Sequence, residues 1–300
     1  MRGVAVSLGV ALGVASACSR EPRLEPIVHY PRPHCPDAGA TARARVKVMT
    51  LNLRHDADQW ERRFAMVADE IVRLDPDVIG MQEVKLSRDQ ANVLDRLVGE
   101  RGGARYEVFT AYKSGPGGVA SGEGLAILTR WPMLVKESAD IGDGRVTLFA
   151  RIAHPNGVID AYNTHFDAHR DADGEEMRDR EALRTVDFIA KHDECHATFL
   201  LGDMNSEADE PPLRRFVAAA FDDSFAAAGA GAPGNTLRIQ LEEGAFTQSP
   251  RRRVDFVLAR TAGRRVATPT ESVVCFKNHD AKGFYPSDHF GVMSTFDLGL

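Results

Sequence analysis

The chain has 300 residues, of which 43% are hydrophobic and 27% charged, as is ordinary for a globular protein with a large core. Its formal net charge of −6 gives no indication of a broad basic surface that would clamp long nucleic acid non-specifically. A metal site would still attract phosphate locally, so the acidic balance does not exclude phosphate-containing substrates. Apolar, strand-like runs recur evenly from about residue 46 to the end, which predicts one domain.

Residues 1–17 have the features of a signal peptide. Arg2 supplies a short positive region, an apolar run follows, and small residues precede Cys18. This placement resembles a bacterial lipoprotein signal and predicts an exported protein with a lipid anchor at Cys18. A plain secretory signal, giving a periplasmic or secreted protein, and a cytoplasmic start are the alternatives. Removing residues 1–17 changes the formal charge from −6 to −7, because Arg2 is the only charged residue among them.

Residues 18–44 contain five prolines and no hydrophobic periodicity, which predicts a flexible tether ahead of a domain at residues 45–300. In an exported chain, Cys35, Cys195 and Cys275 allow one disulfide and leave one thiol over. Their spacing does not choose the pair.

Apolar residues at three- and four-residue steps predict helices at residues 59–74 and 175–192, and a further helix is expected at 88–99. Residues 114–124 and 226–236 are rich in glycine and are expected to be loops. The first of them lacks the Gly-Lys-Ser/Thr ending of a phosphate-binding P-loop. Strands are expected at residues 46–51, 78–82, 106–112, 125–129, 147–152, 158–164, 198–202, 254–258 and 292–296.

Five of the apolar runs end on a carboxylate, an amide or a histidine. Strand ends at one edge of a sheet place such side chains close together, and hard oxygen ligands with imidazoles suit a divalent metal acting on a phosphate ester. The residues at these ends are Asn52, Glu83, His165, Asp203 with Asn205, and Asp288 with His289.

Asn52 and Glu83 offer an amide oxygen and a carboxylate, which are suitable ligands for Mg²⁺ or Mn²⁺. Asp203 and Asn205 are two apart after a buried strand, so their side chains share one face. Asp203 would orient an attacking water, while the Asn205 amide would donate to a phosphate oxygen. The alternative for all four residues is an ordinary role in turns and caps.

Two histidines complete the candidate site. His165 in its charged form would donate to a phosphoryl oxygen or protonate a leaving group, although most single histidines only satisfy local polar groups. Asp255 lies inside an apolar strand and needs a partner. We expect that partner to be His289, whose tautomer Asp255 would fix, with Asp288 facing the metal.

Seven motifs occur in the order found in one protein family. They are Thr50-Leu-Asn52, Asp77-Val-Ile-Gly-Met-Gln-Glu83, Gly124-Leu-Ala-Ile-Leu-Thr-Arg130, Asn163-Thr-His165, Gly202-Asp-Met-Asn205, Val254-Asp255-Phe and Ser287-Asp-His289. Over about residues 46–298 the chain resembles the endonuclease/exonuclease/phosphatase superfamily, the DNase I-like metal-dependent phosphoesterases. The resemblance implies an α+β fold, a four-layer α/β/β/α sandwich.

The resemblance also implies roles for the site residues. Asn52 and Glu83 would bind the metal, with Asp288 in or near its shell. Asp203 or the Asp255–His289 pair would activate the nucleophile, and this choice stays open. The phosphate contacts implied are those of Asn205, His165 and His289.

Two details bear on the branch of the superfamily. Met204 stands where the family usually has an aromatic residue, and its apolar side chain should have little effect. The Thr-His form at His165 resembles the nuclease, sphingomyelinase and phosphatase branches more than the AP endonuclease-like members. Arg178 or Arg180 would reach a phosphate, and Arg180 is the candidate we retain; a solvated helix face is the alternative.

The sequence thus predicts an exported, Mg²⁺-dependent phosphoesterase, phosphodiesterase- or nuclease-like, that acts as a monomer. The alternatives are a sphingomyelinase- or phospholipase C-like enzyme and a small-molecule phosphatase. A binding module without catalysis is a further alternative from a different class. The expected partner is therefore a phosphate ester, whether nucleic acid, phospholipid or small molecule.

Overall fold

The computed structural model describes residues 20–27, 43–238, 240–242, 245–246, 250–260 and 266–299. The expected signal peptide, Cys18 and Cys35 lie outside the described residues. In the described part of the chain, no helix combines the length and the apolar character needed to cross a membrane.

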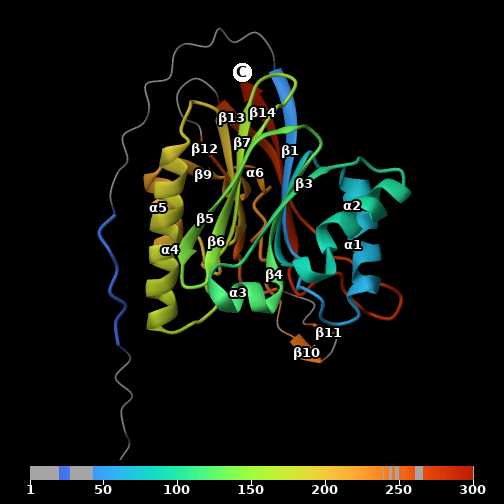
Figure 1. Ribbon diagram of the computed structural model, residues 1–300, viewed down its shortest axis with the longest axis horizontal. Helices are drawn as coiled ribbons and strands as arrows, with labels where there is room; N and C mark the ends of the chain where they lie inside the picture. The colour runs from blue at the N-terminus through green and yellow to red at the C-terminus, as the bar shows by residue number, and fades with distance from the viewer. Residues whose placement is uncertain are drawn as a thin grey trace, which may run out of the picture.

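Two six-stranded sheets, each with one parallel strand pair, form the centre of the molecule (Figure 1). The first sheet, in spatial order, consists of β13 (Val266–Cys275), β14 (Gly291–Gly299), β1 (Arg43–Asn52), β2 (Val78–Lys85), β4 (Glu123–Thr129) and β3 (Glu107–Tyr112). The second consists of β5 (Met133–Gly142), β6 (Arg145–Ile152), β7 (Ile159–His165), β8 (Ala197–Asp203), β12 (Asp255–Arg260) and β9 (Phe221–Asp223). A separate hairpin joins β10 (Gln240–Glu242) and β11 (Ala245–Phe246).

Helices cover the outer face of each sheet, which gives four layers (Figure 1). The helices are α1 (Trp60–Leu74), α2 (Gln90–Glu100), α3 (Gly115–Ser121), α4 (Ala172–Lys191), α5 (Pro211–Ala218) and α6 (Ser224–Ala228), with a 3-10 turn η1 at Leu86–Arg88. The first sheet packs against α1 and α2, and the second against α4 and α5. The predicted four-layer α/β/β/α sandwich is confirmed.

Both faces of the central strands are buried, which explains their nearly continuous apolar runs. In β1, Val46 and Val48 belong to the core between the sheets, whereas Met49 and Leu51 pack toward the helices. Because side chains alternate along a strand, Asn52 continues the row of Val46 and Val48 and points toward the second sheet. Hydrophobic alternation in β1 therefore aims the first candidate ligand at the cleft between the sheets.

The expected strand ends agree with the structure: β1 ends at Asn52, β7 at His165 and β8 at Asp203. The glycine-rich segment 114–124 is not simply a loop as expected. It contains α3, which starts after Ser114 with a proline in its first turn and ends at Gly122 in the left-handed conformation.

The second expected loop, 226–236, is also shorter than predicted. The short helix α6 occupies its first residues, and the Asp223 carboxylate caps that helix by accepting from the backbone N–H groups of Phe225 and Ala226. Five strands were not predicted, namely β5, β9, β10, β11 and β13. The alternating, largely exposed sequence of β5 lacks the apolar run that marks a central strand.

Part of the expected tether lies against the domain beside α4 (Figure 1). We call residues 20–26 the N-terminal strap. Arg215 forms a buried ion pair with Asp179 and also donates to the carbonyls of Glu25 and Pro26. Arg20 adds exposed ion pairs to Asp173 and Glu176 on α4. This stretch is therefore docked on α4 and α5.

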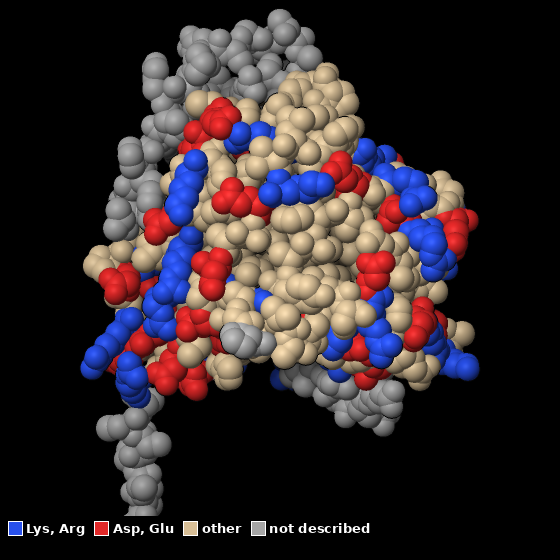
Figure 2. Space-filling view, in the orientation of Figure 1, with Lys and Arg blue, Asp and Glu red and all other residues tan. Residues whose placement is uncertain are grey.

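Two cysteines in the described part of the chain have different states. Cys195 is disulfide-bonded, whereas Cys275 is a buried free thiol. On the face shown in Figure 2, acidic and basic side chains are interspersed, in keeping with the absence of a predicted basic field.

Candidate active site

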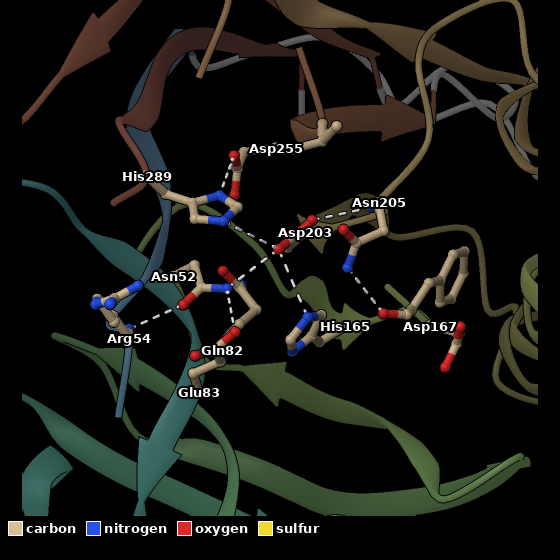
Figure 3. Close-up of polar contacts among 12 residues, drawn as sticks. Asn52, Arg54, Gln82, Glu83, His165, Asp167, Asp203, Asn205, Asp255 and His289 are labelled. Carbon is tan, nitrogen blue, oxygen red and sulfur yellow. Dashed lines mark hydrogen bonds and ion pairs between the residues drawn. The ribbon is translucent and has the colours of Figure 1, made fainter. Parts of the chain in front are cut away.

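Strand register brings the predicted site residues together at one end of the two sheets (Figure 3). In the parallel pair of β7 and β8, His165 lies opposite Asp203. In the antiparallel pair of β8 and β12, Asp203 lies opposite Asp255. The loop before β14 contributes His289, and the end of β1 contributes Asn52 from the facing sheet.

Asp203 is the centre of this constellation and is almost completely buried. Its Oδ2 accepts a hydrogen bond from Nδ2 of Asn52 at 3.1 Å and lies 3.5 Å from Nε2 of His165 and 3.7 Å from Nε2 of His289. Its Oδ1 accepts from the backbone N–H of Asn205 at 2.9 Å. Burial, together with the charge of Asp255, raises the pKa of Asp203 to about 7 against the opposing effect of His289.

The predicted pair of Asp255 and His289 is present. Nδ1 of His289 lies 2.8 Å from Oδ2 of Asp255, and the Asp255 side chain has no exposed surface. This contact leaves Nε2 of His289 directed at Asp203 (Figure 3). Burial opposes the imidazolium form, but the carboxylates of Asp255 and Asp203 outweigh it and raise the pKa of His289 well above its ordinary value.

His165 differs from the prediction in its charge. Its side chain is buried, and burial together with the positive charges of Arg145 and Lys113 holds the pKa of His165 well below its ordinary value. The imidazole is therefore neutral near pH 7, not the charged donor expected from sequence. Its Nδ1 has no hydrogen-bond partner among the described residues.

Asn52 and Glu83 are in contact, as expected of two ligands for one cation. Nδ2 of Asn52 donates to Oε1 of Glu83 at 3.1 Å, while Oδ1 of Asn52 accepts from the backbone N–H of Arg54. Glu83 has a left-handed backbone, with φ of 51°, beside an irregularity in the pairing of β2 with β4. Its carboxylate lines the pocket.

Asp288 lies next to this pair but has a different partner. Its Oδ2 receives a hydrogen bond from Nη1 of Arg54 at 2.6 Å. Burial would raise the pKa of Asp288, but the charges of His289 and Arg54 lower it. The carboxylate is thus ionised and engaged by a guanidinium instead of facing an open metal position.

The chemistry of these donors fits a divalent cation. Glu83 offers carboxylate oxygens and Asn52 an amide oxygen, the hard ligands that Mg²⁺ and Mn²⁺ prefer, whereas the Asp288 carboxylate is held by Arg54. A second set, Asp203, Asp255 and His289, has potential ligand atoms within 4.8 Å of one another. Those atoms are deeply buried and already bonded among themselves, so Glu83 at the pocket is the more accessible anchor.

Two of the predicted phosphate-binding residues, Asn205 and Arg180, are arranged differently from expectation. Asn205 lines the pocket, but its side chain already has protein partners. The Nδ2 of Asn205 donates to the carbonyl of Phe166, and its Oδ1 accepts from Arg170 at 3.3 Å. Arg180 is not among the residues that line the pocket, because it pairs with Asp143 on the surface at 3.4 Å. Arg178 holds the carbonyls of Asp167 and His169.

Sequence reasoning missed three cations that line the pocket, namely Lys113, Arg145 and Arg170. Arg170 follows His165 by five residues, and that proximity was a usable signal. Lys113 and Arg145 lie at strand ends far away in sequence, where no local pattern distinguishes them from solvated charges.

Two buried groups that the sequence did not single out hold the site in place. Nε2 of Gln82 donates to Oγ1 of Thr50 at 2.9 Å and to Oδ1 of Asn163 at 2.7 Å, which ties the two sheets together below Asn52. Arg63, with no exposed surface, donates to backbone carbonyls that follow Asn52 and precede Asp288. Such a framework fixes the positions of site residues.

The sequence matches a family model, that of the Endonuclease/Exonuclease/phosphatase family, over residues 49–289. No curated protein sequence is similar enough to this chain to count as a relative.

Solved structures with this architecture include an endonuclease/exonuclease/phosphatase family protein from Bacteroides thetaiotaomicron. It is 17% identical, with a TM-score of 0.70, and the alignment covers 86% of this chain and 97% of that chain. A mannosyl-6-phosphatase from the same organism is 18% identical, with a TM-score of 0.68 and coverage of 83% and 98%. TDP2 from D. rerio, humanized by 14 mutations, is 16% identical, with a TM-score of 0.67 and coverage of 84% and 98%. At these identities the likeness shows the fold alone.

Proposed function

We propose that this chain, which belongs to the endonuclease/exonuclease/phosphatase family, is a metal-dependent phosphoesterase that hydrolyses its substrate by in-line attack of water. The observation that carries the proposal is the position of Asp203. Its carboxylate lies within 3.7 Å of donors on Asn52, His165 and His289, at the wall of a pocket. Members of the family act on phosphate esters.

Glu83 and Asn52, with Asp288 beside them, would hold Mg²⁺ or Mn²⁺. That cation would neutralise charge on the phosphate and polarise its P–O bonds. Asp255 fixes the ring of His289 through Nδ1, so that Nε2 remains available to the reacting groups. Asp203 is the group placed to accept the proton of the attacking water, because the raised pKa of His289 leaves that imidazole already protonated near neutral pH and able only to donate.

The pocket wall on the other side of Asp203 supplies polar contacts for the phosphate. Asn205 and His165 line it together, and the exposed Arg170 guanidinium is fastened to Asn205. Fixed donors directed at oxygens where charge develops stabilise the transition state more than the ground state. We therefore assign Arg170, and not Arg180, as the arginine nearest the reacting phosphate.

A generic phosphodiester, bis-p-nitrophenyl phosphate, tests the proposal. Wild-type protein should release p-nitrophenol with Mg²⁺ or Mn²⁺ and lose that activity in chelator. Asp203→Asn, which keeps the shape of the side chain, should lower the rate by about 10²–10⁴-fold. Asp69→Asn, at an exposed position on α1, is the matched control.

The outcome also separates the classes of function. Full activity in Asp203→Asn, or no metal-dependent release from any phosphate ester in a panel of DNA, RNA, sphingomyelin, inositol phosphates and sugar phosphates, would contradict the proposal. Calorimetric binding of a phosphate compound without turnover would then favour a non-catalytic binding module. The mannosyl-6-phosphatase neighbour makes sugar monophosphates a necessary part of the panel.

We also propose that the protein is exported and carries a lipid on Cys18. The sequence of residues 1–17 supports export, and so does the disulfide at Cys195, since disulfides persist in oxidising compartments. Metabolic labelling with a fatty-acid analogue should mark the wild-type chain and not Cys18→Ser. Soluble, unlabelled periplasmic protein would instead indicate a plain secretory signal. Light scattering should give the mass of a monomer.

A further inference from the structure

One wall of the active-site pocket is rich in cations. Lys113 follows β3, Arg145 begins β6, and Arg170 lies between β7 and α4, and all three line the pocket beside His165 and Asn205. The pocket has a volume of about 400 Å³. That is the size of a pocket for a small organic ligand, larger than a lone phosphate needs.

These cations are only partly neutralised by their neighbours. Lys113 has an ion pair with Glu123. The nearest carboxylate to Arg145 is Asp167, at 3.7 Å from Nη2, and that carboxylate also accepts from the backbone N–H of His169. Among the described residues, Arg170 has no carboxylate within ion-pair distance and is held by the oxygens of Asn205.

Arg145 has an unused donor in addition. Its side chain is only 13% exposed, and its buried Nη1 has no hydrogen-bond partner within the described part of the chain. A buried donor without a partner costs free energy, and such groups in native structures usually mark a ligand or a water. The oxygen of an anionic ligand in the pocket is a partner that would also match the charge of the guanidinium.

The cations are divided between two places in the pocket. Arg170 lies at Asn205, on the side where the reacting phosphate would bind. Arg145 lies 3.7 Å from Asp167 and Lys113 is paired with Glu123, so both are anchored on different residues from Arg170. The arrangement therefore offers a second anion-binding position, separate from the one at Asn205.

We propose that the pocket binds a phosphate ester carrying a second anionic group, and that Arg145, supported by Lys113, binds that group. This inference rests on the proposed phosphoesterase function and narrows its substrate class. A second phosphate or a carboxylate supplies the required oxygens. A choline headgroup would bring a positive charge to the same wall, so the inference disfavours choline phospholipids as substrates.

A matched ligand pair tests the inference by binding alone. Calorimetry of the whole protein in chelator would compare adenosine 5′-monophosphate with adenosine 3′,5′-bisphosphate, which differ by one phosphate. The bisphosphate should bind about 10- to 100-fold more tightly, as expected for a charge-assisted hydrogen-bond pair. In Arg145→Gln that ratio should fall to within about threefold of unity, whereas Arg96→Gln, at an exposed position on α2, should keep the wild-type ratio.

Several outcomes would overturn the inference. Equal affinities in the wild type would do so, and so would a loss of affinity in Arg145→Gln that is the same for both ligands. Lys113→Gln, which should lower the ratio less than Arg145→Gln does, gives the same test if the first variant does not fold. Replacing the bisphosphate by 3-phosphoglycerate, compared with glycerol 3-phosphate, distinguishes a carboxylate from a phosphate as the second group.

Hydrolysis of bis-p-nitrophenyl phosphate by the same preparations separates this inference from the proposed function. Metal-dependent hydrolysis without any preference for the bisphosphate would contradict only the inference. A bisphosphate preference that depends on Arg145, in a protein that hydrolyses none of the panel, would contradict only the proposed function.

Discussion

Arg63 is a buried arginine whose replacement should affect both stability and the active site. Its guanidinium donates to five backbone carbonyls, those of Leu53, Arg54, His55, Ala57 and Pro286. Burial lowers the pKa of Arg63 to about 10, which still leaves it charged at neutral pH. The residue thereby joins the segment after Asn52 to the segment before Asp288.

The loss of stability expected on replacing Arg63 depends on which of these carbonyls water could reach in the variant. The bonds to Leu53 and Pro286 are buried, so their carbonyls would lose their partner without gaining water, whereas the other three are only partly buried. A hydrogen bond to a charged group contributes about 1.5–3 kcal/mol, so Arg63→Met should lower the free energy of unfolding by about 3–6 kcal/mol. Arg63→Lys should lower the free energy of unfolding by less, because lysine keeps the positive charge and some hydrogen-bond donors.

Denaturant unfolding, followed by the fluorescence of the two tryptophans, measures this change. Arg62→Met is the matched control: Arg62 pairs with Asp280 at a partly exposed position, and its loss should cost at most about 1 kcal/mol. A loss of less than about 1 kcal/mol in Arg63→Met would refute the reasoning, because it would mean that the bonds to these five carbonyls contribute almost nothing net to stability.

Three further predictions concern other parts of the fold. Burial raises the pKa of Glu181 to about 8, so the folded state holds a proton that the unfolded state releases, and stability should fall as pH rises from about 4.5 to 8. The free energy of unfolding of Glu181→Gln should therefore exceed that of the wild type by up to about 4 kcal/mol at pH 8 and by little at pH 4.5. Denaturation at both pH values measures the difference, and equal differences at both would contradict the raised pKa of Glu181. Gly202→Ala would place a Cβ 2.2 Å from the carbonyl oxygen of Thr164, at a φ of +153°. The substitution should lower the free energy of unfolding by about 3 kcal/mol and the melting temperature with it. An unchanged melting temperature would show that β7 and β8 can separate freely. Deleting residues 1–27 should expose the ion pair of Asp179 and Arg215 to water and lower the free energy of unfolding by about 1–3 kcal/mol. Amide hydrogen exchange in α5 should become faster. Unchanged exchange there would mean that the N-terminal strap does not protect the helix.

Much of the candidate site can be predicted from the sequence, because local patterns of apolar and polar residues determine it. Apolar runs that end on Asn52, His165 and Asp203 become strands that end at those residues, since both faces of such strands must be buried. The pairing of Asp255 with His289 was also predictable, because a carboxylate inside an apolar strand requires a partner.

Other features depend on neighbours that no local pattern reveals. The charge state of His165 follows from its complete burial beside Arg145 and Lys113, which lie on other strands. The engagement of Asp288 by Arg54 joins residues from opposite ends of the chain, and so does the position of Arg63 among the loop carbonyls. Helix α3 forms in a glycine-rich segment whose composition alone favours a loop.

The sequence by itself determined the central strands, the polar residues that end β1, β7 and β8, and the family to which these motifs point. Hydrophobic periodicity and the cost of burying an unpaired carboxylate are local properties, so one sequence suffices to read them. Tertiary structure alone decided which cations face the pocket, because Lys113, Arg145 and Arg170 come together only when the two sheets pack. Electrostatic interactions act through space, and distances in space between residues on different strands are set by the packing of the whole fold.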